Sequence, residues 1–345
     1  MSFSSSRFCT LSFFVLILLA ITFPCNAAKR VPAKGRPAPA KPLDITASPY
    51  FAKGDGVTDN TAAINRALAD ASQTRPLKSV YAPVGTFAHA GILQNPGVIF
   101  SGAGAGTVFQ ALDPAEGAVE LSGVGSTLQN CSLVSPNTKT RLSSSHSAAI
   151  CVNGAIRFTI TNVDIGSGTV SGAASAGILC ADRPSSLGTI THNRIANTLA
   201  DGIHLTAGAN AVVVRGNSLT NVGDDMIAVV SYLKDGAVVS HVTIEGNHCI
   251  SQTNGRGISV VGGDHVTIDH NTIDSSDAAG IYLASEDSYN TYAPRDVMVT
   301  KMSFAMPIRS TPSLMAAFMC LAGPRPSMEL RFPIRPRTSR SPAIP

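Results

Sequence analysis

Short apolar segments recur at a regular interval in the second half of the chain. Four similar stretches are each followed eight residues later by another aliphatic side chain, and they span residues 189–195, 213–219, 243–250 and 267–273. Their leading aliphatic positions are separated by 24, 30 and 24 residues: Ile190, Val214, Ile244 and Ile268. A unit of this size cannot bury its own apolar face, but stacked units bury one continuous core. The pattern therefore predicts a solenoid of short strands.

This repeat favours an all-β fold, a single-stranded right-handed parallel β-helix. One register of the repeat, two positions before an aliphatic residue, holds Asn193, Asn217 and Asn271. Asn tolerates left-handed backbone at a turn, and stacked Asn side chains can form hydrogen-bonded ladders. An extra loop around residues 232–236 explains the longer interval, and residues 128–133 and 160–165 form weaker units. The competing solenoid is a leucine-rich-repeat horseshoe, but its Leu-rich consensus is missing.

A short helix is expected near the start of the folded region. Thr58 and Asp59 are good N-cap residues, and an apolar helix face follows them at Ala62, Ala63, Ile64, Ala67 and Leu68. We place the β-helix domain at residues 44–300, after a linker at 28–43 that is rich in Ala, Pro and Lys.

The first 27 residues have the pattern of a secretory signal peptide. Arg7 supplies a positive charge, residues 11–23 form an uncharged apolar run, and Cys25-Asn26-Ala27 offers a cleavage site. An uncleaved anchor is the alternative, although the run is short for a membrane span. We therefore expect a secreted or periplasmic protein that has no membrane contact after cleavage.

The repeat stops after Thr300. Residues 301–345 hold eight of the 21 prolines and five of the eight methionines, with no strand alternation or helix period. Two hypotheses explain this segment: a disordered tail, or an altered reading frame that truncates the solenoid. Rung-like sequence in another reading frame downstream of Thr300 would support the second.

The net charge of +4 conceals an acidic body between basic ends. Residues 44–300 carry 13 Lys and Arg against 21 Asp and Glu, whereas residues 28–43 carry five basic side chains and no acid. An acidic body argues against a nucleic-acid partner. Five cysteines follow the cleavage site, and their spacing fits no zinc pattern: Cys131, Cys151, Cys180, Cys249 and Cys320. We expect buried thiols, with a single disulfide as the alternative, and no metal site.

The register of the repeat brings three aspartates together. The position two before the second aliphatic residue holds Asp201, Asp225 and Arg256 in successive units, and Asp224 precedes Asp225. Stacked strands lie about 4.8 Å apart, so these acids should be neighbours, with Arg256 one coil further. Close carboxylates raise at least one pKa while a nearby Arg lowers others, which separates acid and base roles. Hydrolysis of a glycosidic bond needs such a pair.

Strict alternation of inward and outward side chains would point Asp201 and Asp225 into the core, where unpaired carboxylates cost too much free energy. We therefore expect the turn before Gly202 to break the alternation. By the same parity an outward column forms, with candidate substrate-binding residues at His204, Ser259 and Tyr282 and with Ala228 between them. The alternative is that these residues have structural roles. Asp is common at turns, Arg256 would form ion pairs with these acids, and His204 and Tyr282 would be ordinary surface residues.

Residues 53–64, KGDGVTDNTAAI, resemble the N-terminal signature of pectate-lyase-3/epimerase-like members of the pectin-lyase-like β-helix superfamily. That resemblance covers roughly residues 44–300 and implies that the helix caps the open end of the coil. Later motifs are similar to those of the polygalacturonases, glycoside hydrolase family 28: Asn197-Thr198, Asp201-Gly202-Ile203 and Gly223-Asp224-Asp225.

The polygalacturonase resemblance implies that Asp224 is the general acid and that Asp201 and Asp225 activate water. The chain departs from that family at three points. Arg256 stands where the family has His, two extra residues separate Thr198 from Asp201, and the family's Arg-Ile-Lys motif has no counterpart near residues 286–290.

Three functions are compatible with these patterns, and each has a polysaccharide as partner. The first is an inverting hydrolase of an acidic, pectin-like polymer or a neutral one, with no cofactor. The second is a lyase or uronate epimerase, in which the Asp cluster binds Ca²⁺ and Arg256 abstracts a proton. The third is a non-catalytic adhesin, glycan-binding module or tailspike-like protein, because fold alone does not fix function.

Overall fold

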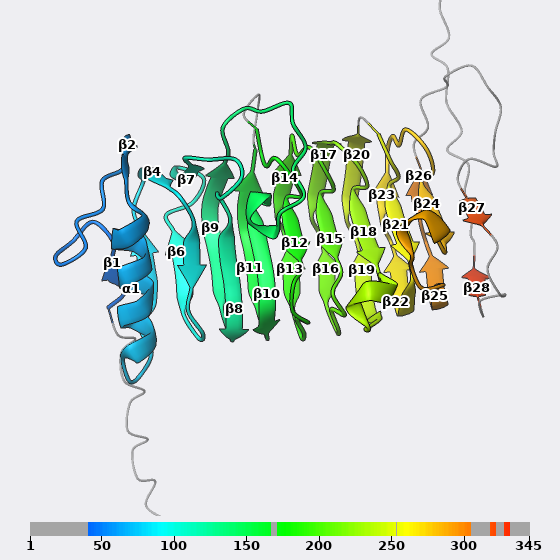
Figure 1. Ribbon diagram of the computed structural model, residues 1–345, viewed down its shortest axis with the longest axis horizontal. Coiled ribbons are helices and arrows are strands. Elements are labelled where there is room, and N and C mark those ends of the chain that lie inside the picture. Colours follow the sequence, from blue (N-terminus) through cyan, green and yellow to red (C-terminus); the bar gives the residue numbers. More distant parts are fainter. Residues whose placement is uncertain (1–40, 167–170, 253, 305–317, 322–327, 332–345) are drawn as a thin grey trace, which may run out of the picture. The chain divides into compact units, whose positions relative to one another are not determined.

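The computed structural model describes residues 41–166, 171–252, 254–304, 318–321 and 328–331. It confirms an all-β parallel β-helix, in which the chain winds coil by coil and equivalent strands stack side by side (Figure 1). The expected signal peptide and most of the linker and tail lie outside the described residues. Among the residues described, no helix is long and apolar enough to cross a membrane.

In the part of the chain that the structure describes, one face of the coil is a nine-stranded parallel sheet. Its strands are β5 (Ile92–Gln94), β8 (Val119–Val124), β10 (Ile150–Ile156), β12 (Ile178–Cys180), β15 (Ile203–Leu205), β18 (Ile227–Val230), β21 (Ile258–Val261), β24 (Ile281–Ala284) and β27 (Phe318–Leu321). Within the described residues, three 3₁₀ helices interrupt the connections: η1 (Ser145–Ser147), η2 (Leu233–Asp235) and η3 (Asp287–Tyr289).

The described strands of the other faces form a 19-stranded sheet in two runs. The runs merge at β9 and β11, because both strands pair with members of each run. The first run contains β1 (Leu43–Asp44), β3 (Val80–Ala82), β6 (Ile99–Gly102), β9 (Thr127–Val134), β11 (Thr159–Ile165), β13 (Thr189–Thr191), β16 (Val213–Arg215), β19 (Val239–Glu245), β22 (Gly263–Asp269), β25 (Arg295–Thr300) and β28 (Met328–Arg331). The second contains β2 (Asp55–Asp59), β4 (Gly85–His89), β7 (Thr107–Ala111), β14 (Arg194–Ala196), β17 (Ser218–Val222), β20 (His248–Gln252), β23 (Thr272–Ile273) and β26 (Ser303–Phe304).

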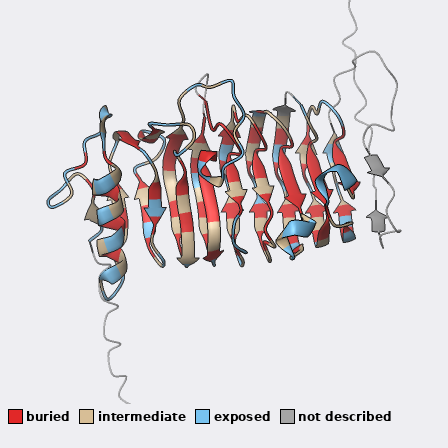
Figure 2. Ribbon diagram, in the orientation of Figure 1, coloured by how far each residue is buried: buried red, intermediate tan, exposed pale blue. Residues whose placement is uncertain are grey.

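The predicted register is confirmed residue by residue. Ile190 pairs with Val214, Val214 with Ile244 and Ile244 with Ile268. The second aliphatic column is also continuous and fully buried: Ile203, Ile227, Ile258 and Ile281. Buried positions therefore run along the interior of every coil (Figure 2). Strand pairing continues beyond Thr300, since β26, β27 and β28 extend the ladders.

A buried ladder of Asn side chains fixes one corner of the coil. Asn193, Asn217 and Asn247 each donate Nδ2 to Oδ1 of the next Asn at 2.9 Å, and the run ends at Asn271. Each Oδ1 also accepts the preceding Asn backbone N–H, and each Nδ2 reaches a backbone carbonyl such as that of Ile190. All four side chains are at most 1% exposed. The ladder therefore satisfies backbone groups that would otherwise be buried without partners.

The left-handed residues at this corner are not the Asn residues, as the sequence suggested, but the residues before them. Positive φ angles of 57°, 64°, 63° and 52° occur at His192, Gly216, Gly246 and His270. The preceding residue makes the turn, which leaves the Asn side chain pointing inward to bond along the stack.

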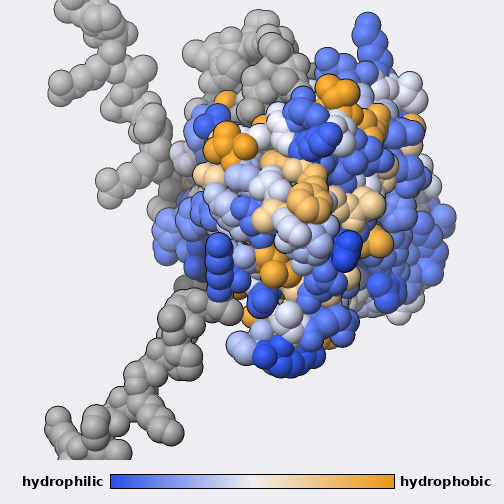
Figure 3. Space-filling model, turned by 90° about the vertical axis from the view of Figure 1, so that its left-hand side faces the viewer, coloured by the Kyte–Doolittle hydropathy of each residue, from blue (hydrophilic) through white to orange (hydrophobic). Residues whose placement is uncertain are grey.

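Helix α1 (Thr61–Gln73) packs Ile64, Ala67, Leu68 and Ala71 against the first coils. The N-cap residue is Asn60, not Thr58 or Asp59. The side chain of Asn60 is buried and bonds the backbone of Lys53, so it fastens the preceding turn instead of capping the helix. The surface at this end is mostly hydrophilic with scattered apolar residues, which protects the open edge of the solenoid (Figure 3).

The expectation of buried thiols is confirmed at four positions, where the cysteines are free: Cys131, Cys151, Cys180 and Cys249. Burial raises the pKa of the Cys151 and Cys249 thiols to about 12, so both are unreactive at neutral pH. The side chain of Cys320 lies outside the described residues.

The first prediction concerns the Asn ladder. Asn217→Ala leaves the Ile190 carbonyl and the Asn193 N–H buried without these partners, so we expect a loss of about 3 kcal/mol in the free energy of unfolding. Urea unfolding followed by circular dichroism measures it. Thr191→Ala on the same coil is the control, because its bond to Thr161 is only part-buried, and it should cost under about 1 kcal/mol. Equal losses for both variants would contradict a structural role for the ladder.

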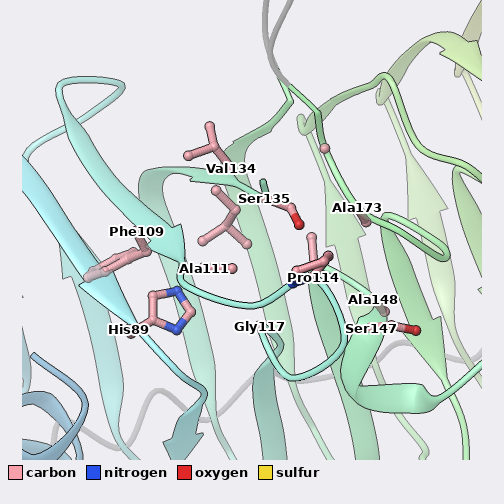
Figure 4. A pocket seen from close by; sticks show the side chains of 13 residues that line it. His89, Phe109, Ala111, Pro114, Gly117, Val134, Ser135, Ser147, Ala148 and Ala173 are labelled. Carbon is pink, nitrogen blue, oxygen red and sulfur yellow. The ribbon is translucent and has the colours of Figure 1, made fainter. Parts of the chain in front are cut away.

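The second prediction concerns His89 on β4, which is 1% exposed and packs beside Phe109 (Figure 4). Its Nδ1 accepts the N–H of Gly91, and burial lowers the pKa of the imidazole to about 4. The unfolded chain therefore binds a proton at higher pH than the folded one. The resulting stability is complete above about pH 6.5 and is lost as pH falls towards 4, by up to about 3 kcal/mol.

His89→Asn tests this linkage, because the Asn carbonyl can keep the bond to the Gly91 N–H without titrating. Unfolding free energies measured between pH 4 and pH 7 should show a shallower slope for the variant than for the native chain. Identical slopes would show that another group controls the pH dependence.

Candidate functional site

The three aspartates lie in the turns that precede β15 and β18. The Asp225 N–H donates to Oδ1 of Asp201 at 2.9 Å, and the Gly202 N–H donates to the Asp225 carbonyl at 3.0 Å. One carboxylate oxygen from each of Asp201, Asp224 and Asp225 lies within 4.8 Å of the others. The register therefore brings the acids together, as the sequence predicted. Together with His204, these residues are called the acid cluster below.

Asp225 is fully engaged by its neighbours. Its Oδ1 accepts Nε and the backbone N–H of Arg256 at 2.7 and 2.8 Å. Its Oδ2 accepts Nη2 of Arg256 at 2.7 Å and the Ser259 hydroxyl at 2.5 Å. The Asp225 side chain is only 3% exposed. A carboxylate with both oxygens held in this way has little capacity left for a water molecule, which favours a structural role.

Arg256 is a fixed cation that closes this network. It also donates to Oε1 of Glu286 at 3.1 Å and lies over the Tyr282 ring, 4.4 Å from its centre. Burial opposes the charge, but the contacts to Asp225 and Glu286 outweigh it and raise the pKa of the guanidinium. This argues against Arg256 as the proton-abstracting base of a lyase and supports the alternative, a partner of the acids.

The outward column has the predicted register but not the predicted exposure. His204 pairs with Ala228, Ala228 with Ser259, and Ser259 with Tyr282. Ser259 is completely buried and Tyr282 is 5% exposed, so neither lines an open cleft. Arg256 covers the Tyr282 ring, which packs in a small apolar cluster on this outer face. Only His204 of the three candidate binding residues borders open space.

His204 and Asp201 form a short contact. Nδ1 of His204 lies 2.6 Å from Oδ2 of Asp201, and the His204 side chain is 14% exposed. Burial disfavours the charged imidazole, but Asp201, Asp225 and Asp224 outweigh burial and raise its pKa. The contact orients the ring, and it assigns Nδ1 as the protonated nitrogen because a carboxylate only accepts.

Asp224 is the most accessible of the three aspartates, with a side chain that is 30% exposed. Its Oδ2 accepts Nη1 of Arg141 at 2.6 Å. Arg141 comes from the loop between β9 and β10, 83 residues earlier in the chain. Sequence reasoning missed Arg141, since loop residues have no repeat register. The sequence drew attention to the segment that contains Glu286 only through the polygalacturonase resemblance.

A groove of about 410 Å³ runs beside the cluster over β12 and β15. Leu179 and His204 lie along its floor strands, the loop with Arg141 and Leu142 borders it, and the segment at Tyr232 borders it as well. Asp201 lines the groove directly, and Arg141 holds Asp224 near its edge.

The three aspartates do not fit a Ca²⁺ site well, although their oxygens lie close together. Asp225 already binds Arg256, Asp224 binds Arg141, and Asp201 bonds the Asp225 N–H and His204. A cation would face two guanidinium groups and few free oxygens, whereas Ca²⁺ takes six to eight oxygen ligands.

The third prediction separates buried from exposed ion pairs. Arg256→Ala leaves Asp225 charged and buried, so we expect a loss of about 3–5 kcal/mol in unfolding free energy. Arg141→Ala removes a more exposed pair and should cost under about 1 kcal/mol. Chemical unfolding of both variants measures the difference, and a small loss for Arg256→Ala would contradict the assigned network.

A family model described as "Right handed beta helix region" matches residues 117–294, which is more than half of the chain. A comparison with curated proteins finds no match. The catalytic unit of a thermostable GH87 alpha-1,3-glucanase from Streptomyces thermodiastaticus strain HF3-3 is similar, with 21% identity and a TM-score of 0.55. The alignment covers 76% of this chain and 47% of that one, so this chain spans about half the length of the glucanase structure.

Two further solved structures show the same fold. The A-module of the Azotobacter vinelandii mannuronan C-5 epimerase AlgE4 aligns at 16% identity and a TM-score of 0.51, covering 76% of this chain and 79% of that one. The Streptococcus pneumoniae surface protein and adhesin PfbA aligns at 14% identity and a TM-score of 0.60, covering 76% and 77%. At these identities the likeness establishes the fold alone. Taken with the family match, it shows that the chain belongs to the right-handed β-helix family.

Proposed function

We propose that this protein hydrolyses glycosidic bonds of a polysaccharide, with Asp224 as general acid and Asp201 as the group that activates water. The observation that carries this proposal is the acid cluster beside the groove: carboxylate oxygens within 4.8 Å, of which Asp201 lines the groove and Asp224 is the most accessible. Two carboxyl groups with different surroundings supply the acid and base that the reaction needs.

The glucanase structures add support through the spacing of their aspartates. Three complexes of the GH87 catalytic domain with nigerose or tetrasaccharides each carry an aspartate-to-alanine substitution at a different position, the second and third lying 23 and 24 residues after the first. In this chain Asp224 and Asp225 lie 23 and 24 residues after Asp201. One coil of the solenoid separates the first acid from the pair in this chain.

Accessibility assigns the roles, because Asp224 has the most exposed side chain of the three aspartates and Asp201 lines the groove. Asp224 gives its proton to the glycosidic oxygen as the bond to the anomeric carbon breaks. Asp201 takes a proton from the water that attacks this carbon, with its carboxylate held by His204 and the Asp225 N–H. Asp225, bound to Arg256 and Ser259, fixes the turn that carries both Asp224 and the N–H on Asp201.

The stereochemical outcome stays a prediction. Carboxyl groups of inverting enzymes usually lie about 6.5–9.5 Å apart, and those of retaining enzymes about 5–5.5 Å. Oxygens within 4.8 Å are close for the inversion expected from the sequence. Proton NMR of the first product formed shows which anomer is released.

We also propose export, as a secreted or periplasmic protein, because residues 1–27 have the pattern of a secretory signal peptide. A uronate substrate has less support. Glu286, in the segment where the polygalacturonase resemblance calls for a basic motif, is itself an acid and binds Arg256.

The fourth prediction tests the proposed acid. Asp224→Asn should lower the rate of reducing-end release from the preferred polysaccharide by about 10²–10⁴-fold, because general acid catalysis contributes this much. The matched control is Asp264→Asn, an acid that pairs with Arg295 on another face and should keep full activity. The panel is α-1,3-glucan, polygalacturonate and alginate.

Three results would overturn the proposal. Full activity of the Asp224→Asn variant removes Asp224 from the reaction. Products that absorb in the ultraviolet indicate lyase chemistry. Glycan binding without any turnover, unchanged by substitution of the aspartates, indicates an adhesin or binding module.

A further inference from the structure

One side chain that lines the groove beside the acid cluster carries a polar atom with an unusual environment. Among the described residues, only Nε2 of His204 and Oε1 of Gln94 are buried side-chain atoms with no hydrogen-bond partner. A buried, unpaired polar atom destabilises the fold unless something satisfies it. His204 lines the groove, whereas Gln94 does not. A ligand in the groove is therefore the natural partner for this nitrogen.

The other ring nitrogen determines which ligand groups fit. Because Nδ1 of His204 bonds Asp201 at 2.6 Å, the ring cannot flip without losing that contact. Nε2 then carries a proton when the imidazole is charged and is an acceptor when the imidazole is neutral. A hydroxyl group both donates and accepts, so it suits Nε2 in both states. A carboxylate only accepts, so it suits the charged ring alone.

The charges of the groove also favour an uncharged ligand. Two basic side chains besides His204 line it, Arg141 and Lys234, against three carboxylates: Asp182, Asp201 and Asp235. Arg141 is already paired with Asp224, and Nζ of Lys234 lies 5.2 Å from the centre of the Tyr232 ring. No surplus of positive charge remains for a polymer that carries a carboxylate on every sugar unit.

Resting on the proposed hydrolysis, we infer that this groove is a subsite for a neutral, hydroxyl-rich sugar, in which Nε2 of His204 binds a sugar hydroxyl. Because Nε2 is shielded from water, a side chain of the groove must shift before the hydroxyl reaches it. Apolar surface for the faces of the sugar ring comes from Leu142, Leu179 and Tyr232. His204 is thus a specificity-determining residue next to the reacting bond.

A binding experiment on the Asp224→Asn full-length chain tests this without turnover. Calorimetry compares two disaccharides, the neutral nigerose and the acidic digalacturonate. His204→Asn keeps an amide near Asp201 but removes the distal nitrogen, so we expect about 10-fold weaker nigerose binding. His204→Gln places its amide near the position of Nε2 and should retain most of the affinity. The circular dichroism spectrum of each variant checks its folding.

A second measurement does not depend on substitution of His204. In the Asp224→Asn chain with ¹⁵N-labelled histidine, nigerose should shift the Nε2 resonance of His204 and leave that of buried His89 in place. No shift, or unchanged nigerose affinity in His204→Asn, overturns the inference and leaves the hydrolase proposal intact. Tighter binding of digalacturonate than of nigerose overturns the neutral class. A separate result, full turnover by the Asp224→Asn variant, would refute the hydrolase proposal.

Discussion

The stacking of coils in a fixed register is the constraint on which the rest of this structure depends. Backbone hydrogen bonds join neighbouring strands, but they alone do not choose between registers that differ by one step. The buried aliphatic columns and the Asn ladder do choose, because a slip of one residue would expose the columns and leave the ladder without partners. The same register sets the distance between Asp201 and Asp225, which are one coil apart.

Local chemistry then gives three similar carboxylates different properties. Asp225 is paired with the Arg256 cation and accepts the Ser259 hydroxyl, Asp201 is oriented by His204 and a backbone N–H, and Asp224 remains near the solvent. The two guanidinium groups that hold this arrangement come from opposite directions. Arg256 belongs to the next coil, whereas Arg141 reaches Asp224 from a loop three coils earlier in the stack. A solenoid provides the columns, and loops that fold over them complete the site.

The sequence predicts those features of the structure that follow from the repeat period. It gives the fold, the aliphatic columns and the meeting of Asp201 with Asp224 and Asp225, because each follows from a spacing of about one coil. It does not give the burial of Ser259 and Tyr282, because the register places Arg256 in a column but does not show that its side chain folds over the Tyr282 ring. It does not give Arg141 either, because a loop residue has no repeat register. The positions of left-handed backbone were also misassigned, because Asn side chains at this corner serve the core instead of the turn.

The central claim is that the coil register makes Asp201 and Asp224 act as one catalytic unit. A double-mutant cycle on kcat/KM with Asp201→Asn and Asp224→Asn measures this coupling most directly. If the two acids serve one reaction step, the double variant should be little slower than the slower single variant. Independent, multiplicative losses, or no loss in either single variant, would contradict the account.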